Sequence, residues 1–364
     1  MATLIVVVIT AFALTVSIPS LAMAKGPVVY IFGDSMSDVG NNNYLPFSLA
    51  KSDYPWYGID YLNGLPTGRF TNGRTIGDIM SYKLGIPPPP PYMSLSMDDN
   101  AILQGINYAS GGAGILNETG LYFVQKLSFD DQITCFEETK EAITSKIGEK
   151  ASEKLCNEAL YFIGLGSNDY INNFLQPFMA DGRVYTHDEF VGLLLITLDR
   201  QLKRLYSLGA RKIMFSGLAP LGCIPSQRVR SGTGQCLYDV NQYALEFNSQ
   251  IKKLLTSLNF QLPGANMILA DCYSIVMDLI KNPQNYGFKI SDTSCCNVDT
   301  TVGGLCLPNA ELCPNRREFV FWDAYHTSDA ANQVIADRLF AELNFGRTFS
   351  PAPAMASGPA PSPK

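Results

Sequence analysis

The sequence predicts an α/β fold in which a mostly parallel sheet has helices on both faces. Four short apolar runs, rich in β-branched and aromatic residues, have the composition of strands buried on both faces. Each run ends in a turn that contains Gly, Ser or Asp, and helical periodicity follows before the next run begins. Strand, turn and helix repeated in this way are typical of a parallel sheet. The runs are residues 28–32, 159–163, 212–215 and 267–270.

The segments between these runs predict loops and helices in a clear order. Residues 44–75 are rich in Tyr, Pro, Gly and Asn with aromatic residues throughout, which indicates a long ordered loop. Five prolines at 87–91 predict a rigid extended connection, and residues 105–114 (GINYASGGAG) a glycine-rich turn. Helices are expected at 76–84, 128–157, 188–208, 240–258, 274–281 and 328–343, with a short apolar run at 319–322 before the last one.

Length and composition favour one large domain. The chain has 364 residues, of which 46% are hydrophobic and 11% aromatic, enough to bury a large core. A net charge of −6 without any basic run argues against nucleic acid as a partner. We find no internal repeat and no linker within residues 25–347, so this span is expected to form a single domain.

The two ends of the chain differ from the rest. The first 24 residues contain no charged side chain, residues 4–18 are almost entirely apolar, and Ala22-Met23-Ala24 fits a signal-peptidase site. A transmembrane anchor is the alternative, but the run is shorter than the roughly 20 residues that a span needs. We therefore expect a cleaved secretory signal at 1–24, a secreted protein and no stable membrane anchor. Residues 348–364, rich in Pro, Ala and Ser, are expected to form a disordered tail.

Cysteine content and one sequon agree with secretion. All nine cysteines follow residue 24, which fits an oxidising compartment, and Asn117-Glu118-Thr119 makes Asn117 a candidate for exposure and glycosylation. A metal site at 295–313 is the weaker interpretation of the cysteines there, because that segment has no CxxC pair and no histidine. Spacing does not fix the disulfide pairing. It allows Cys295 and Cys296 to pair with Cys306 and Cys313, Cys223 with Cys236, and Cys135 with Cys156, with Cys272 left over.

A first candidate for catalysis is Ser35, within residues 28–43 (VVYIFGDSMSDVGNNN). It follows the first predicted strand in the sharp turn Gly33-Asp34-Ser35, at the carboxyl edge of the sheet, where ligands bind in open α/β folds. The free N–H groups of the helical turn that follows favour an oxyanion. Serine after glycine is also common in ordinary turns, so a role for Ser35 as nucleophile depends on a base elsewhere in the chain.

Two histidines are available as that base, His187 and His326. His187 lies at a predicted helix start, where a positive imidazolium is disfavoured, and is expected on the surface. His326 follows Asp323 by three residues, just before the last helix. That spacing lets the carboxylate hold Nδ1–H and leave Nε2 free to accept a proton. The structural alternative is an Asp-capped turn with a bystander histidine.

Two further turns at strand ends could supply donors to an oxyanion. In Gly111-Gly112-Ala113-Gly114 a backbone N–H can approach a ligand because glycine has no Cβ. In residues 166–169 (GSND) the side-chain amide of Asn168 could donate. The alternatives are an ordinary glycine-rich turn and an Asn that only closes its turn.

Together these blocks resemble the plant GDSL esterase/lipase family of the SGNH hydrolase superfamily, over nearly all of residues 27–343. Met36 stands where the motif has Leu; it is expected to pack beneath the turn without loss of activity, because the two side chains have similar volumes. The matching blocks are Gly33-Asp34-Ser35 with Asp38 and Gly40-Asn41-Asn42, NYASGGAG at 107–114, Gly166-x-Asn168-Asp169, and Asp323-x-x-His326.

The resemblance implies a flavodoxin-like three-layer α/β/α domain and a role for each of these residues. Ser35 would be the nucleophile, His326 the base and then the acid, and Asp323 the residue that orients it. The oxyanion donors would be the N–H of Ser35, the N–H of Gly112 (with Gly111 one register away) and the side chain of Asn168. No metal or organic cofactor is implied, and the expected location is the apoplast or cell wall.

The expected function is hydrolysis of carboxylic esters, in acyl lipids or acylated cell-wall components, through an acyl-serine intermediate. The chain has no GxSxG, which excludes the ordinary α/β-hydrolase elbow. An acyltransferase of the cutin-polymerising type would keep every residue of the site, and a catalytically silent secreted binding protein would keep only the fold. The complete set of Ser35, Asp323 and His326 argues against the second. The physiological substrate, the acyl-chain preference and the oligomeric state remain open.

Overall fold

A five-stranded sheet is the centre of the computed structural model, which describes residues 26–296 and 304–343. Its strand order is β2-β1-β3-β4-β5, and every neighbouring pair is parallel. This is the flavodoxin-like order, so the predicted class and the parallel sheet are confirmed. The strands are β1 (Val29–Gly33), β2 (Gly105–Asn107), β3 (Leu160–Gly164), β4 (Lys212–Ser216) and β5 (Asn266–Ala270).

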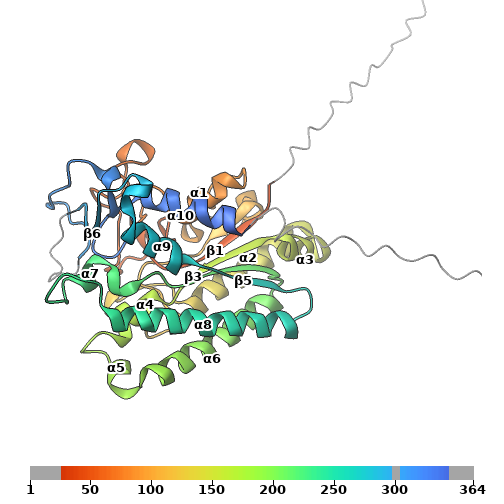
Figure 1. Cartoon of the computed structure of the whole chain (residues 1–364). Coiled ribbons are helices and arrows are strands. Elements are labelled where there is room, and N and C mark those ends of the chain that lie inside the picture. Colours follow the sequence, from red (N-terminus) through yellow and green to blue (C-terminus); the bar gives the residue numbers. More distant parts are fainter. Residues whose placement is uncertain (1–25, 297–303, 344–364) are drawn as a thin grey trace, which may run out of the picture.

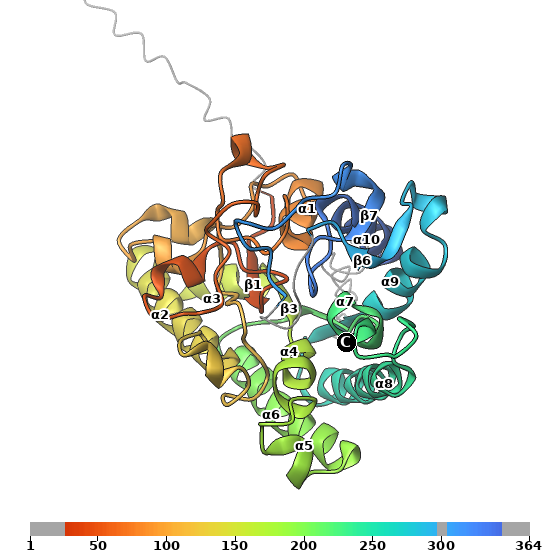
Figure 2. The ribbon, with the colours of Figure 1, turned by 90° about the vertical axis from the view of Figure 1, so that its left-hand side faces the viewer.

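Helices cover both faces of the sheet, as Figures 1 and 2 show. The α1, α9 and α10 helices lie on one side, while α2, α6 and α8 lie on the other, where aromatic rings of α2 pack edge-on against β1. The bounds are α1 (Ile76–Lys83), α2 (Phe129–Ile147), α3 (Glu149–Glu158), α6 (His187–Ser207), α8 (Tyr238–Gln261), α9 (Cys272–Lys281) and α10 (Asp329–Glu342). Three short helices are α4 (Ser167–Asp169), α5 (Asp181–Val184) and α7 (Pro225–Arg228).

Two expected elements differ from the structure. Residues 105–107, expected to begin a turn, form β2 beside β1. Gly105 permits this pairing because it has φ +110°, and a Cβ there would lie 2.3 Å from the carbonyl oxygen of Val29. The helix expected at 128–157 is two helices, α2 and α3, which meet at Gly148 with φ +82°. Elsewhere the predicted helices and strands are confirmed to within a few residues.

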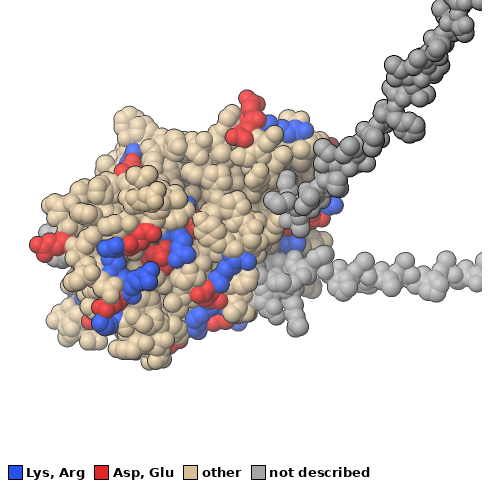
Figure 3. Space-filling view, turned by 90° about the horizontal axis from the view of Figure 1, so that it is seen from above, with Lys and Arg blue, Asp and Glu red and all other residues tan. Residues whose placement is uncertain are grey.

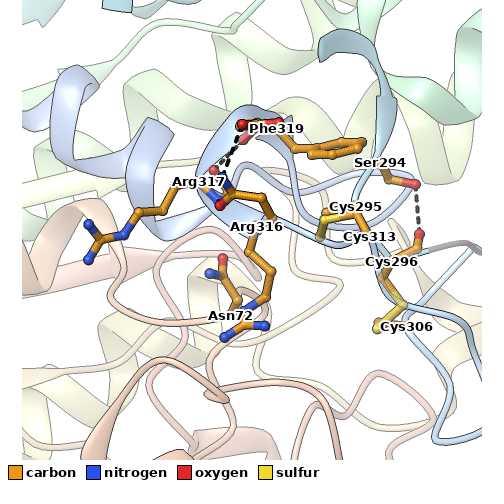
Figure 4. Close-up of a disulfide and its surroundings, with 12 residues drawn as sticks. Asn72, Ser294, Cys295, Cys296, Cys306, Cys313, Arg316, Arg317 and Phe319 are labelled. Carbon is orange, nitrogen blue, oxygen red and sulfur yellow. Dashed lines mark hydrogen bonds between the residues drawn. A yellow bond between two sulfur atoms is a disulfide. The ribbon is translucent and has the colours of Figure 1, made fainter. Parts of the chain in front are cut away.

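A second, smaller core lies beside the sheet. It is built on a two-stranded parallel sheet of β6 (Ile290–Ser294) and β7 (Phe319–Phe321). Disulfides Cys295–Cys313 and Cys296–Cys306 close the intervening loop, and Figure 4 shows them side by side. The aromatic loop at 44–75 packs on these disulfides through Tyr57 and Phe70. Its aromatic residues are therefore partly core.

The remaining cysteines only partly follow the pairing that their spacing allowed. Cys223 pairs with Cys236. Cys135 and Cys156 are both free thiols, so the bond considered between them is absent. They belong to different helices and have different neighbours: Cys135 hydrogen-bonds Tyr92, whereas Cys156 is buried beside Tyr161. Cys272 is free, as expected.

Charged groups on the face seen from above in Figure 1 are mixed rather than sorted by sign (Figure 3). Ion pairs also join this part of the chain: Lys83 of α1 pairs with Asp337 of α10, and Arg74, just before α1, pairs with Asp329 of α10. Within the described part of the chain, no helix has the length and hydropathy to cross a membrane. The signal peptide expected at 1–24 and the tail expected at 348–364 lie outside the described residues.

Candidate active site

Ser35 lies in a tight turn at the carboxyl end of β1. In the sheet β1 has β2 on one side and β3 on the other, and the strand order reverses at this point. Gln132 of α2 fixes the chain before this turn: its side chain accepts the N–H of Gly33 at 2.9 Å and donates to the Gly33 carbonyl at 2.8 Å. The carboxylate of Asp34 accepts the N–H of Met36. Met36 is half-buried and lines the cavity in front of Ser35, rather than packing beneath the turn as expected.

His326 and Asp323 meet Ser35 from the segment between β7 and α10. The Nε2 atom of His326 lies 2.7 Å from the Oγ atom of Ser35, and its Nδ1 atom lies 2.8 Å from both carboxylate oxygens of Asp323. A carboxylate only accepts hydrogen bonds, so Nδ1 carries the proton and Nε2 accepts the Ser35 hydroxyl. Asp323 is fully buried and also accepts the N–H of His326 and of Tyr325, which fixes its orientation.

Tyr57 is a partner of Asp323 that the sequence did not reveal. Its hydroxyl donates to Oδ2 of Asp323 at 2.7 Å and accepts the N–H of Cys306 at 3.0 Å. Burial, and then the neighbouring Asp323 charge, raise the pKa of Tyr57 well above its ordinary value, so the hydroxyl keeps its proton. The aromatic loop indicated this region, but nothing in the sequence distinguishes Tyr57 from the other tyrosines there.

The glycine-rich turn after β2 is held against the Ser35 turn by Asp38. One carboxylate oxygen of Asp38 accepts the N–H of Gly40 and of Asn41, and the other accepts the N–H of Gly111 at 2.9 Å. Gly112 has φ +84° and lines the cavity, and a Cβ there would lie 2.6 Å from Phe123. Among the described residues, the N–H of Gly112 has no acceptor in the protein.

Asn168 brings a third turn, after β3, to the same edge of the sheet. Its side-chain amide donates one N–H to the carbonyl of Ala113 at 2.8 Å, and its side-chain oxygen accepts from Asn172. Asn168 also lines the cavity, and its second amide N–H has no acceptor in the described part of the protein. The next residue, Asp169, is fully buried and binds the loop that follows the glycine turn, through the N–H groups of Ile115 and Leu116.

Three carboxyl groups lie buried beneath these turns. Burial raises the pKa of Asp34, Asp38 and Asp169 to about 6 in each case. The backbone N–H groups that each of them accepts act in the opposite direction, because they favour the charged form. The turns that surround Ser35 are thus connected through carboxylates that have little contact with solvent.

A large cavity borders these groups. It has a volume of about 1020 Å³ and is lined by Ser35, Gly112, Asn168 and His326. Ligand pockets in proteins commonly measure roughly 300–1,000 Å³, so the space in front of Ser35 can hold a sizeable organic substrate. Most of the remaining lining is apolar, from loop 44–75, the sheet and the helices α1, α9 and α10.

His187 lies apart from this site. Its ring stacks on Tyr243, its Nδ1 atom lies 3.0 Å from Glu246, and its Nε2 atom lies 3.1 Å from the Tyr170 hydroxyl. The side chain is only 11% exposed, so the expected surface position is wrong. With Asp188 and Glu246 it forms the one group of described residues with the spacing of a metal site. Both ring nitrogens already have hydrogen-bond partners, Glu246 and Tyr170, which accounts for the position of His187 without a metal.

The sequon lies at the edge of the same region. Asn117 is exposed, as expected, and its carbonyl accepts from Lys126. Thr119 is instead buried, with its hydroxyl donating to Asp169 at 2.7 Å. The sequon therefore presents its asparagine to solvent while its threonine holds the loop onto the core.

The sequence model of the GDSL-like lipase/acylhydrolase family matches residues 29–339, which include all four blocks of the site. The chain belongs to this family. A GDSL esterase/lipase of Arabidopsis thaliana is 65% identical over 91% of this chain and 93% of its own length. Another from the same plant is 47% identical, over 90% and 91%. GDSL esterase/lipase 7 of Arabidopsis thaliana is 42% identical, over 87% and 88%.

These relatives confirm the family expected from the sequence blocks, and the enzyme class they support is a hydrolase of carboxylic ester bonds. Among solved structures, one described as a carbohydrate esterase is similar to this GDSL hydrolase at 14% identity, with a TM-score of 0.40 over 89% of this chain and 70% of that one.

Proposed function

We propose that this protein is a secreted serine esterase that hydrolyses carboxylic esters through an acyl-serine intermediate. The observation that carries the proposal is the hydrogen-bonded line from Ser35 through His326 to Asp323 at the wall of a large apolar cavity. A serine hydroxyl is a weak nucleophile until an adjacent base accepts its proton, and a base held by a carboxylate is suited to that task.

In the first step, the Oγ atom of Ser35 attacks the ester carbonyl while its proton passes to Nε2 of His326. Asp323 stabilises the imidazolium that forms, and Tyr57 and two backbone N–H groups hold this carboxylate in place. The tetrahedral intermediate then collapses: the bond to the alcohol oxygen breaks, and His326 returns the proton to the leaving alcohol.

Three donors are proposed for the oxyanion: the N–H of Ser35, the N–H of Gly112 and the second amide N–H of Asn168. All three belong to cavity-lining residues, and none has an acceptor among the described residues. The alternative donor, Gly111, already gives its N–H to Asp38, which favours Gly112. Donors fixed in this way stabilise the charge that develops in the transition state without having to reorganise.

Deacylation repeats these steps with water. His326 takes a proton from water as the oxygen attacks the acyl carbon, and it returns the proton to Ser35 when the ester bond to the enzyme breaks. An alcohol in place of water would give acyl transfer with the same residues. Product analysis with and without an added alcohol acceptor distinguishes the two reactions.

We infer further that residues 1–24 are a secretory signal, that 25–347 form the hydrolase domain and that Asn117 carries a glycan outside the cell. Three disulfides among the described residues support an oxidising compartment, and the exposure of Asn117 supports its modification. N-terminal sequencing of the secreted protein and its mass before and after peptide-N-glycosidase treatment test these points. An Asn117→Gln variant whose mass differs from that of the wild type only by the substitution itself would contradict the glycan.

The experiment that tests the esterase compares p-nitrophenyl butyrate hydrolysis by the wild type and by Ser35→Ala, with Ser37→Ala from the same turn as the control. Activity lost only in Ser35→Ala, together with fluorophosphonate labelling of Ser35 in the wild type, supports the proposal. Equal activity in all three proteins means that another nucleophile is responsible. A folded wild type that neither reacts nor is labelled is a silent binding protein.

A further inference from the structure

The cavity in front of Ser35 runs from the surface into the interior of the molecule. At its outer end it is lined by Leu49, Phe178 and Leu307, whose side chains are 42–65% exposed. At its other end the lining residues are 1–5% exposed and lie between the sheet and the helices α9 and α10. We call this end the inner arm and define it by Ile31, Phe162, Met214, Val276, Ile335 and Leu339.

The inner arm has the character of a site for a hydrocarbon chain. Its defining side chains are all apolar, and the carboxyl and imidazole groups that line the cavity, those of Asp34 and His326, belong to the Ser35 end. Water in such a space would lack the two to four polar partners that hold a buried water molecule. Protein interiors are otherwise packed about as densely as organic crystals, and an empty apolar cavity lowers stability. An apolar ligand would recover this loss.

The two ends of the cavity differ in what they can release. In a reaction through an acyl-serine, the alcohol must leave while the acyl group is still attached to Ser35. The open end, lined by exposed side chains, gives the alcohol a path to solvent. The inner arm is enclosed by the sheet and two helices, so it suits the part of the substrate that stays bound.

We propose that the inner arm binds the alkyl chain of the acyl group, so that the substrates are esters of long, unbranched fatty acids. This inference rests on the proposed function, because it assigns the two halves of the ester to the two ends of the cavity. Each methylene buried there should increase kcat/KM by up to about fourfold. Selectivity for long acyl chains is the consequence.

Val276 of α9 is the position to test. A Val276→Phe variant narrows the inner arm without touching Ser35, His326 or the oxyanion donors. Met277→Phe is the matched control, because this neighbour on the same helix is half-buried and does not line the cavity. Ile335→Phe narrows the arm from α10 and serves if Val276→Phe does not fold, as judged by circular dichroism and thermal melting.

The measurement is the ratio of kcat/KM for p-nitrophenyl palmitate to that for p-nitrophenyl butyrate. We expect this ratio to exceed one in the wild type and to fall at least about tenfold in Val276→Phe and Ile335→Phe, with no change in Met277→Phe. A ratio that is unchanged in folded Val276→Phe and Ile335→Phe overturns the assignment of the inner arm and leaves the esterase intact.

Binding of cis-parinaric acid, a fluorescent long-chain fatty acid, separates this inference from the proposed catalysis. If the wild type hydrolyses neither ester, the proposed function fails, and the binding of cis-parinaric acid alone then decides whether the inner arm binds an alkyl chain. Saturable binding to the wild type that is lost in Val276→Phe and kept in Met277→Phe supports it. Absent binding, or binding that is equal in all three proteins, overturns it.

Discussion

The hydroxyl of Tyr57 donates to the carboxylate of Asp323 while it accepts the N–H of Cys306. A residue in the loop after β1 is thereby connected both to the orienting carboxylate and to the disulfide loop that precedes β7. We expect Tyr57→Phe to lower kcat roughly tenfold, because Asp323 loses a buried donor and Cys306 an acceptor. Steady-state kinetics with p-nitrophenyl butyrate measure this. Tyr54→Phe should retain near wild-type kcat, because among the described residues it is the hydroxyl of Tyr57, and not that of Tyr54, that hydrogen-bonds Asp323 and Cys306.

The Cys296–Cys306 disulfide should act on the rate through the same hydroxyl. Replacing both cysteines by alanine frees the loop that carries the Cys306 N–H, so we expect lower kcat in addition to a loss of stability of about 2–4 kcal/mol. Combined with Tyr57→Phe, the loss of kcat should be less than the product of the two separate effects, because both changes break one chain of hydrogen bonds. Multiplicative effects in this double-mutant cycle would contradict that coupling.

Asn168→Ala tests the proposed oxyanion donor. Loss of one such donor typically lowers kcat by about 10²–10³, with little change in KM, because the interaction strengthens in the transition state. Asn172→Ala removes the group that donates to the Asn168 side-chain oxygen and accepts the Tyr122 hydroxyl, but it leaves the proposed oxyanion donor in place, so its effect on kcat should be clearly smaller. Comparable losses of kcat in the two variants would mean that Asn168 acts only by holding its turn.

The buried ion pair between Arg69 and Asp78 should be a main contributor to stability near the site. Arg69 donates twice to this carboxylate, at 2.7 and 2.8 Å, and both side chains are less than a tenth exposed. Arg69→Met leaves a buried, partly unpaired charge, for which we expect a loss of about 3–5 kcal/mol in urea unfolding. Lys203→Met breaks an exposed pair with Asp199 and should cost less than about 1 kcal/mol.

The contribution of three buried carboxyl groups to stability should fall as the pH rises from about 4 to 7. Burial raises the pKa of Asp34 to about 6, so the folded state binds this proton more tightly than the unfolded chain does. This stabilisation is complete below the pKa that Asp34 has in the unfolded chain, and it is lost as the pH rises through the pKa that Asp34 has in the folded protein. Asp38 and Asp169 act in the same direction. In Asp34→Asn, the free energy of unfolding measured with urea should decline less over this pH range, by on the order of 1–3 kcal/mol. Exposed Asp98→Asn should follow the wild type.

The meeting of the four blocks could be predicted because parallel strands end at one edge of a sheet. Ser35, Gly112 and Asn168 follow three adjacent strands, β1, β2 and β3, and each strand end is marked by Gly, Ser or Asn in the sequence. The choice of His326 over His187 depended on Asp323 three residues before it. A short spacing in one turn constrains geometry strongly, and the structure brings this pair to Ser35.

Other features had no local signal. Tyr57 reaches Asp323 across 266 residues of sequence, a contact that only the packing of two loops creates. The β2 strand is three residues long and begins with glycine, so it lacks an apolar run. The inner arm depends on how far the helices α9 and α10 stand from the sheet, which side-chain periodicity does not specify. The free state of Cys135 and Cys156 likewise depends on which way each helix faces.

Ser35 and His326 are separated by 291 residues, although their side chains are in direct contact. At synthesis rates of roughly 5–20 residues per second, the serine leaves the ribosome about 15–60 seconds before the histidine does. Throughout that interval the growing chain carries a nucleophile without its base. Contacts between distant parts of a chain also form late in folding. Hydrolytic activity therefore requires that the whole domain has been synthesised and folded, and an incomplete chain does not hydrolyse the esters around it.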